Sequence, residues 1–491
     1  MKIAPTTFLR KPFLFSFLQS LLLRVDILWL QLSYFAILFV LGFFVLANLE
    51  PRNPLNRPKN YDLFFTSVSA VTVSSMSTVE MEAFSNTQLF ILSILMLLGG
   101  EVFTSMLELR IKRFKLVQMT KTQYFNSNSC IDLENDSNSS KNSTDLKQDS
   151  MKFLGFVVLI YFLIVHMSAF LLVSLYMALV PSARDVLSKK DLNIPIFSIV
   201  TIISTFTNCG YLPTNENMMV FKKDLGLLVI LIPLALLGNT LYPVFLRIML
   251  LVVRKVSDKE ELEYVLRNHS EMGYNHLLSG FRCWFLGLTS IGFIGIQFVL
   301  LMSMEWKSEI MEGLSLLEKV IGSLFQVVNT RHTGESVFDL SLVSPAVIVL
   351  FITLMYLPPY TYFLPREDKD NKCNEEQKNG LVGFLLVSPL TFLIIAIMLI
   401  CITEAENMHK DPLNFSVLNI IFEVISGYGN VGFSLGYSCK RQVQPDGNCK
   451  DAWYGFAGRW NNMSKLILIV VMIFGRLKKF HKNGGKAWKL S

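Results

Sequence analysis

The sequence has few charged residues and very few of the side chains that build metal or redox sites. Only 17% of its 491 residues are Asp, Glu, Lys or Arg, and it contains 6 His and 7 Cys. Soluble domains carry about 25% charged residues, so much of this chain must face something other than water. The net charge of +7 comes without a long basic run that is interleaved with aromatic residues. We therefore expect no nucleic-acid partner.

Motifs for catalysis and for nucleotide hydrolysis are also missing. The histidines are scattered, and none stands in a His-Glu-x-x-His spacing. No Gly-x-Ser-x-Gly elbow lies between a strand and a helix, and there is no Walker motif. A multi-span membrane enzyme, which needs a nucleophile, an acid–base pair or a metal cluster, is the disfavoured alternative. We expect neither ATP-driven pumping nor a cofactor.

Long apolar runs dominate what is present. The chain is 52% hydrophobic, with 39 Phe, and its mean hydropathy is +0.44. A spanning helix needs about 20 apolar residues. The last apolar run along the chain, 466–475, has only ten residues. It crosses the membrane only if Lys465 or Arg476 snorkels or faces an aqueous cavity. The sequence predicts an all-α polytopic membrane protein with eight transmembrane helices, at 27–49, 83–107, 153–183, 225–246, 283–304, 340–365, 380–403 and 466–475.

Four other stretches are partly apolar but rich in Ser, Thr, Asn and Gly, and each lies between two expected spans. Their turns align on Ser75, Gly210, Gly334 and Gly432, and the residue six positions earlier is serine in three of the four. We interpret them as re-entrant pore loops at 63–79, 192–215, 320–338 and 412–436. The chain is then four covalently joined helix–pore loop–helix repeats around one pseudo-fourfold cation pore, at 27–108, 151–253, 278–365 and 380–476.

A ring of such loops suits cation passage. Irregular backbone survives at membrane depth only where protein or water satisfies its polar groups. Loops around one axis direct carbonyls at a cation and replace part of its hydration shell. The half-helices before the turns point their negative ends at the same place. The residues expected near this filter are Ser74, Asn208, Cys209, Thr333 and Val431.

The distribution of basic residues predicts the orientation. An even number of spans places both termini on one side, together with the linkers 109–150, 254–277 and 366–379. That side carries the larger share of Lys and Arg, and the tail 477–491 is basic without an acid. By the positive-inside rule this side is cytoplasmic. Residues 1–26 are interpreted as a cytoplasmic N-terminus with an interfacial segment, and the polar tract 126–150 as partly disordered.

The four loop sequences resemble those of the plant high-affinity potassium transporter (HKT) family, within the Trk/Ktr cation transporter superfamily. The resemblance covers nearly the whole chain and is weakest in residues 1–26 and in the long linker. The segments that carry it are Phe64-Phe-Thr-Ser-Val-Ser-Ala-Val-Thr-Val-Ser-Ser-Met-Ser-Thr-Val-Glu-Met-Glu, Ser204-Thr-Phe-Thr-Asn-Cys-Gly-Tyr-Leu-Pro-Thr-Asn-Glu-Asn, Val328-Asn-Thr-Arg-His-Thr-Gly-Glu and Tyr428-Gly-Asn-Val-Gly-Phe.

The resemblance implies a plasma-membrane transporter that forms a homodimer with one pore per subunit. Members with serine in the first loop resemble sodium-selective forms, and members with four glycines resemble potassium-permeable ones. Ser75 places this chain with the serine type. We therefore expect a passive, sodium-selective transporter or channel in which Na⁺ is the cargo. The alternative is a potassium-permeable transporter or a sodium–potassium symporter of the same fold.

Two residues near the loops, Asn208 and Arg476, each have two possible roles. Asn208 either keeps the filter mouth uncharged or only hydrogen-bonds its turn. Arg476 is either a gate or a snorkelling anchor, and Glu101 is expected to form a salt bridge with a basic residue of a neighbouring repeat. Arg331 and His332 are expected beside Glu335.

The carboxylates expected to raise the cation concentration at an outer vestibule are Glu80, Glu82, Glu216, Glu335 and Asp339.

The cysteines divide by the expected side of the membrane. Cys439 and Cys449 flank a loop that this topology places outside the cell, where a disulfide between them is reasonable. Cys130, Cys283 and Cys373 lie at the cytoplasmic face and are expected to be reduced.

The orientation is directly testable. A cysteine placed in the linker 126–150 should react with a membrane-impermeant thiol reagent only after the cells are permeabilised. Labelling of intact cells at that position would overturn the cytoplasmic assignment of both termini.

Overall fold

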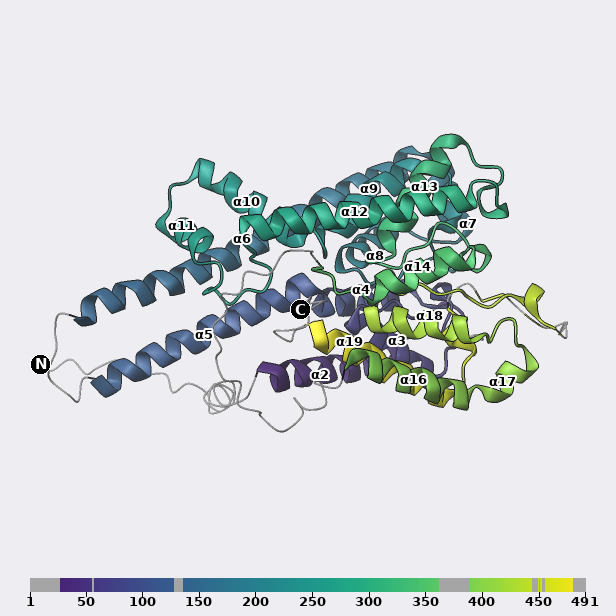
Figure 1. The fold of residues 1–491 in the computed structure, drawn as a ribbon, viewed down its shortest axis with the longest axis horizontal. Helices are drawn as coiled ribbons and strands as arrows, with labels where there is room; N and C mark the ends of the chain where they lie inside the picture. Colours follow the sequence, from purple (N-terminus) through teal and green to yellow (C-terminus); the bar gives the residue numbers. More distant parts are fainter. Residues whose placement is uncertain are drawn as a thin grey trace, which may run out of the picture.

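The computed structural model describes residues 27–54, 57–127, 136–361, 388–443, 449, 451–452 and 455–479. These residues are overwhelmingly helical, and the β-structure among them is one isolated bridge between Tyr437 and Ala452. Figure 1 shows an elongated bundle from which two long helices, α5 and α6, run out together at one end. The all-α prediction is confirmed.

Ten α-helices lie among the described residues of the first two repeats and their linkers, 27–277. They are α2 (Ile27–Asn48), α3 (Asn60–Thr72), α4 (Asn86–Gly99), α5 (Glu101–Ser127), α6 (Asp136–Leu179), α7 (Pro181–Lys189), α8 (Ile194–Thr207), α9 (Leu225–Leu237), α10 (Tyr242–Val256) and α11 (Glu260–Arg267).

The last two repeats hold the remaining described α-helices. They are α12 (Gly280–Glu305), α13 (Leu316–Asn329), α14 (Pro345–Tyr356), α16 (Pro389–Thr403), α17 (Ala405–Lys410), α18 (Val417–Gly429) and α19 (Asn462–Lys479). Short 3₁₀ turns lie between them: η2 (Met81–Ala83), η3 (Asn217–Phe221), η4 (Glu309–Met311), η5 (Leu340–Leu342), η6 (Cys439–Arg441) and η7 (Phe456–Arg459).

The lengths and apolar composition of the helices can be compared with the eight transmembrane helices that the sequence predicts. Three described helices are long and apolar enough to cross a membrane alone, in α2, α6 and α12. The bent pairs α4–α5 and α9–α10 bring this number to five if each pair is one span. The other three expected spans correspond to α14, α16 and α19. The structure gives α14 12 residues, α16 15 and α19 18, and α19 ends at the last described residue, Lys479.

Two expected spans are bent rather than straight. The 83–107 segment turns by 50° between α4 and α5, and the 225–246 segment turns by 84° between α9 and α10. Each bend follows a glycine that lies against another helix: a Cβ on Gly99 would overlap the carbonyl of Val71, and one on Gly238 would overlap that of Phe206. The close approach holds the first half of each span against the end of a pore helix.

The same contact recurs in the fourth repeat, where a Cβ on Gly475 would overlap the carbonyl of Tyr428. In all three repeats the carbonyl belongs to the residue four positions before the aligned turn residue. Only a residue without a side chain permits this approach of a helix to a backbone carbonyl. The repeat is therefore visible in packing as well as in the turns.

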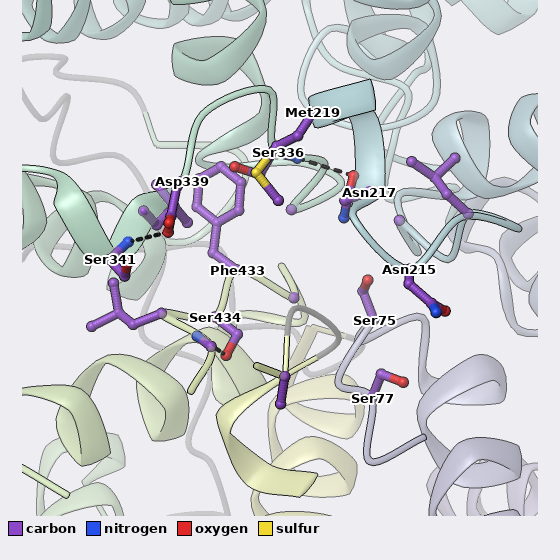
Figure 2. Close-up of a pocket in the computed structure, with 18 of the residues that line it drawn as sticks. Ser75, Ser77, Asn215, Asn217, Met219, Ser336, Asp339, Ser341, Phe433 and Ser434 are labelled. Carbon is purple, nitrogen blue, oxygen red and sulfur yellow. Dashed lines mark hydrogen bonds between the residues drawn. The ribbon is translucent and has the colours of Figure 1, made fainter. Parts of the chain in front are cut away.

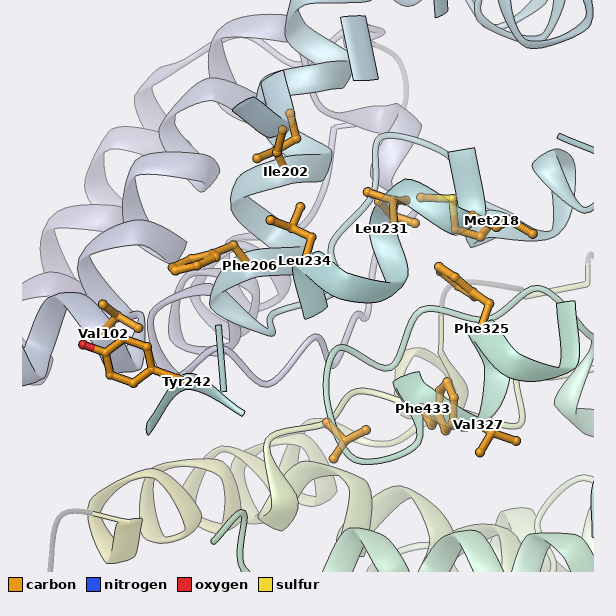
Figure 3. Packing of buried hydrophobic residues seen from close by; sticks show 14 of the residues in the cluster. Val102, Ile202, Phe206, Met218, Leu231, Leu234, Tyr242, Phe325, Val327 and Phe433 are labelled. Atoms are coloured by element: carbon orange, nitrogen blue, oxygen red, sulfur yellow. The ribbon is translucent and has the colours of Figure 1, made fainter. Parts of the chain in front are cut away.

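The buried apolar residues form two clusters, and the pore loops join them. One cluster draws mainly on repeats 2 and 3, and part of it, including Phe206, Tyr242 and Phe325, is shown in Figure 3. The other draws mainly on repeats 1 and 4. Cys209 of loop 2 lies in the second cluster, whereas Val431 and Phe433 of loop 4 lie in the first. The loops therefore cross from one half of the molecule into the other.

The polar tract 126–150, for which the sequence predicts partial disorder, is helical where the structure describes it. Helix α5 continues to Ser127 and α6 begins at Asp136. Each helix extends a long apolar span, and propagating a helix that already exists fixes only one residue per hydrogen bond. Residues 1–26, 128–135 and 480–491, and the linker 366–379, lie outside the described residues.

The glycine contacts predict a stability difference. Gly475→Ala places a methyl on the Tyr428 carbonyl and should destabilise the fold by roughly 1–3 kcal/mol, as overpacking does. Gly292→Ala in α12 is the matched control, because a Cβ there meets nothing within 4 Å. Thermal melting of the purified protein should show a lower midpoint for the first variant alone. Equal midpoints would contradict the proposed contact.

Candidate ion filter

The four aligned turn residues share one unusual backbone conformation. Their φ angles are 55° at Ser75, 85° at Gly210, 65° at Gly334 and 97° at Gly432. All four line one cavity of about 70 Å³, shown in Figure 2. A water molecule takes up about 30 Å³ of liquid volume, so the space suits small, partly hydrated species.

The loops touch one another around this cavity. A Cβ on Gly210 would overlap the carbonyl of Thr333, and one on Gly334 would overlap that of Val431. A Cβ on Gly432 would overlap that of Ser75 and lie 2.9 Å from the Ser74 carbonyl oxygen. The three glycines therefore have no room for a side chain, and Ser75 carries the one Cβ of the ring.

The pore helices produce these turns through their C-terminal caps. Helices α3, α8 and α18 each end at a left-handed residue, followed by an amide that bonds back to the serine carbonyl five positions earlier, as in the Schellman motif. These bonds are Ser74 N to Ser69 O at 2.9 Å, Cys209 N to Ser204 O at 2.9 Å and Val431 N to Ser426 O at 3.1 Å. The filter residue comes next.

The third loop departs from this pattern. Its helix α13 ends at Asn329, the next residue Thr330 stays right-handed, and Gly334 N bonds to the Asn329 carbonyl at 3.2 Å. This is also the loop with Val328 where the others have serine. The structure thus explains the single exception in the sequence repeat by a different turn.

Two asparagines fix the ends of their pore helices. The Asn208 amide donates to the carbonyls of Thr205 at 3.0 Å and Ala235 at 3.1 Å. Asn430, its counterpart, donates to Ser74 Oγ at 2.7 Å and to the Met472 carbonyl at 3.2 Å. Asn208 therefore makes the turn hydrogen bond that one of its two readings requires, and it ties α8 to α9.

The expected vestibule carboxylates occupy different environments. Asp339 lines the cavity, and its Oδ1 accepts from Ser341 N at 2.9 Å (Figure 2). Glu82 and Glu216 both bind Lys190, with N–O distances of 2.5 and 2.6 Å. Glu80 is exposed. Lys190, which the sequence did not single out, therefore offsets two of these charges and joins repeat 1 to repeat 2.

Glu335 does not lie in an open vestibule. It is fully buried, and its Oε1 accepts a hydrogen bond of 2.7 Å from Thr205 Oγ of α8. Its backbone N–H donates to Thr333 Oγ at 3.2 Å. The left-handed turn at Gly334 directs the next side chain away from the cavity and into the neighbouring repeat. This carboxyl group therefore joins the third loop to α8 of repeat 2.

The neighbours of Glu335 in the sequence have other contacts. Arg331 donates to the Pro358 carbonyl at 2.7 Å, and its guanidinium lies over the Phe293 ring. His332 Nδ1 lies at hydrogen-bond distance from the Val328 carbonyl.

Sequence reasoning missed the serines two positions after three of the turn residues. Ser77, Ser336 and Ser434 line the cavity. Ser77 Oγ donates to the Val79 carbonyl at 2.6 Å, and Ser336 Oγ donates to that of Phe338. The shared spacing from the turn was a readable signal.

Arg476 lies inside the molecule rather than at its surface. It is 1% exposed and donates to the carbonyl of Gly99, at the bend between α4 and α5. A snorkelling anchor would reach water, so this reading does not fit. Lys465, in the first turn of α19, pairs with Asp62 at 2.8 Å.

The loop that follows the fourth turn carries a disulfide between Cys439 and Cys449, whose Cα atoms are 5.9 Å apart. Cys209, Cys283 and Cys401 are free. Within the described residues, no group of three or more His, Cys, Asp or Glu side chains is placed to hold a metal ion.

The same architecture occurs in a solved structure. The crystal structure of the potassium transporter TrkH from Vibrio parahaemolyticus aligns with a TM-score of 0.53 and 13% identity, over 93% of this chain and 83% of that one. The fold and the ring of loops thus define a multi-pass membrane protein of the TrkH architecture. The TrkH family model, described as a cation transport protein, matches residues 124–361 and 385–481.

Curated relatives are much closer in sequence. "Sodium transporter HKT1" of Arabidopsis thaliana is 50% identical over 460 residues, 90% of each chain. "Cation transporter HKT1;3" of Oryza sativa subsp. japonica is 45% identical over 94% of this chain and 91% of that one. The chain belongs to the HKT family, within the Trk superfamily of cation transport proteins. This membership excludes the alternative of a membrane enzyme.

The Thr205–Glu335 hydrogen bond predicts a further stability difference. Thr205→Val removes the donor and leaves a buried carboxyl oxygen without it, which should destabilise the fold by about 1–3 kcal/mol. Thr201→Val is the control, since Thr201 is equally buried on α8 and its hydroxyl has no hydrogen-bond partner among the described residues. Melting midpoints of the purified variants would test this, and equal stability would refute the bracing role of Glu335.

Proposed function

We propose that this chain is a sodium-preferring, passive cation transporter of the plasma membrane, and that ions pass the ring of Ser75, Gly210, Gly334 and Gly432. The observation that carries the proposal is the ring itself: four left-handed turns line one cavity, and one of them bears a Cβ. Negative ends of α3, α8, α13 and α18 meet there and favour a cation.

Ser75 makes the ring uneven. Its Oγ stands 2.8 Å from the position that a Cβ on Gly210 would occupy and 2.7 Å from that on Gly432. A large ion that needs equal coordination by four loops loses most from this crowding. A smaller ion that keeps part of its water loses less. Whether size or field strength governs such filters is debated, and this account rests on size.

The relatives give independent support. The Arabidopsis thaliana relative is named a sodium transporter, and two relatives from Oryza sativa are named cation transporters. A potassium-permeable transporter or a sodium–potassium symporter of the same fold is the alternative, because a more distant relative from Candida albicans is named a potassium transporter. Ser75 is the feature that favours sodium.

The remaining parts of the proposal concern assembly and control. Arg476 acts as a gate: it is a buried cation at the bend beside Gly99 and opposes cation passage electrostatically. Asp339 and Glu80, together with Glu82 and Glu216, whose charges Lys190 offsets only in part, attract cations to the outer mouth. The chain forms a homodimer with one pore per subunit, lies in a lipid bilayer, and has both termini in the cytoplasm.

Ser75→Gly tests the sodium preference. The change removes the only Cβ of the ring, lowers the strain of a positive φ, and should raise the potassium permeability relative to sodium about tenfold, equivalent to about 1.4 kcal/mol. The measurement is the reversal potential under paired sodium and potassium solutions. Ser77→Gly is the matched control, because it removes the same atoms from the same cavity two residues further on.

An unchanged permeability ratio in a conducting Ser75→Gly protein would remove Ser75 as the determinant of selectivity. A wild-type reversal potential that follows both ions equally would support the potassium-permeable alternative.

A further inference from the structure

A second, much larger cavity lies far from the filter, between the helices α5 and α6. Its volume is about 910 Å³, within the range of roughly 300–1,000 Å³ that small-ligand sites occupy. It lies where these two helices leave the bundle in Figure 1, and the start of α11 lies against α6 beside it. Nothing in the proposed ion path uses this cavity.

The polar lining of the cavity suits a phosphate. Arg110 and Arg113 of α5 and Lys152 of α6 supply three cations, and no salt bridge of these three is found among the described residues. Arg113 Nε is buried without a hydrogen-bond partner in the described structure. Paired donors on a planar guanidinium match phosphate oxygens in geometry. An anion in the cavity would lie among the side chains of Arg110, Arg113 and Lys152, which line it.

Two carboxylates also line the cavity, Asp149 and Glu261. With the three cations they leave a net charge of +1. Carboxylates repel a bare phosphate but accept hydrogen bonds from hydroxyl groups. The lining therefore favours a ligand that carries both a phosphate and free hydroxyls, in preference to inorganic phosphate or a simple amine headgroup.

The apolar lining leads to the membrane. Phe153, Phe156 and Leu159 of α6 line the cavity, and Phe156 is 59% exposed. An exposed apolar stripe continues from Phe156 along the outer face of α6, with Leu163, Met167, Leu171 and Leu175 each more than half exposed. A membrane-facing helix presents such a stripe to acyl chains. The cavity is therefore open to the lipid side as well as to its cationic end.

We propose that this cavity binds an anionic phospholipid with a hydroxylated headgroup, of the phosphatidylinositol class. The phosphate lies among Arg110, Arg113 and Lys152, the ring hydroxyls face Asp149 and Glu261, and one acyl chain follows the apolar stripe of α6. Basic pockets between helices at the cytoplasmic face of a membrane are known to take such headgroups. The inference uses the cytoplasmic assignment of the α5–α6 linker and is independent of ion selectivity.

Lipid titration of the full-length protein in detergent, followed by native mass spectrometry, tests the site. The probes are dioctanoyl phosphatidylinositol 4-phosphate, dioctanoyl phosphatidylcholine and the soluble headgroup inositol 1,4-bisphosphate. We expect the phosphoinositide to bind at least about tenfold more tightly than either comparison, because both the cations and the stripe contribute. Equal binding of the soluble headgroup would overturn the lipid assignment. Phosphatidylcholine also has a phosphate but has no net charge and no headgroup hydroxyls, so equal binding of it would overturn the preference for an anionic, hydroxylated headgroup.

A matched pair of triple variants separates a site from diffuse attraction. Arg110→Gln with Arg113→Gln and Lys152→Gln should weaken phosphoinositide binding at least about tenfold. Arg254→Gln with Lys255→Gln and Arg282→Gln removes the same charge from exposed positions of α10 and α12 and should leave binding within about twofold. An equal loss in both variants would mean that no specific site exists.

Gly155→Leu keeps every charge and fills the cavity. A Cβ at Gly155 has ordinary contact with Leu109, at 3.8 Å, so the variant can fold. Phosphoinositide binding should fall while the elution profile stays that of the wild type. Retained affinity in this variant would place the lipid elsewhere and refute the proposal.

Discussion

The structure depends on the close approach of four polar loops that leave no room for side chains. Three glycines with positive φ stand against the backbone or Cβ of the adjacent loop, so each loop is held by the next. Backbone at this depth needs protein or water partners, and the ring places the loops where both are within reach. The ring also joins the two apolar clusters. Cys209 of the second loop is buried in the cluster of repeats 1 and 4, and Val431 of the fourth loop is buried in the cluster of repeats 2 and 3.

The pore helices meet the ring through contacts that repeat with the chain. Gly99, Gly238 and Gly475 bring the following helix onto the carbonyl four residues before the turn. Two of these helices bend directly afterwards. The requirement to seat the end of a pore helix thus shapes spans that a hydropathy profile reads as straight. Arg476 follows the third of these glycines and reaches the first, so the same contact places the buried cation.

Local signals made the ring predictable. Small turn residues, a serine six positions earlier and flanking apolar runs are features of short sequence windows, and they identified Ser75, Gly210, Gly334 and Gly432. The deviation of the third loop was also visible, at Val328. Partners between repeats were not predictable in this way. Lys190 meets Glu82 across 108 positions, and Glu335 meets Thr205 across 130, so nothing in the local pattern distinguishes them from ordinary loop charges.

The placement of Glu335 has a consequence for how the filter handles charge. Glu335 and Glu423 are both buried, and both accept hydrogen bonds: Glu335 from Thr205 Oγ, and Glu423 from the Ala457 amide at 3.0 Å. Neither of them lines the filter cavity, where Asp339 and Asp451 provide the carboxylates. The four turns themselves therefore carry little direct carboxylate charge, and the C-terminal ends of four helices lie beside them. Under the proposal that ions pass this ring, the fit of the backbone around the ion sets the discrimination between cations, and the one Cβ at Ser75 is a large change to that fit.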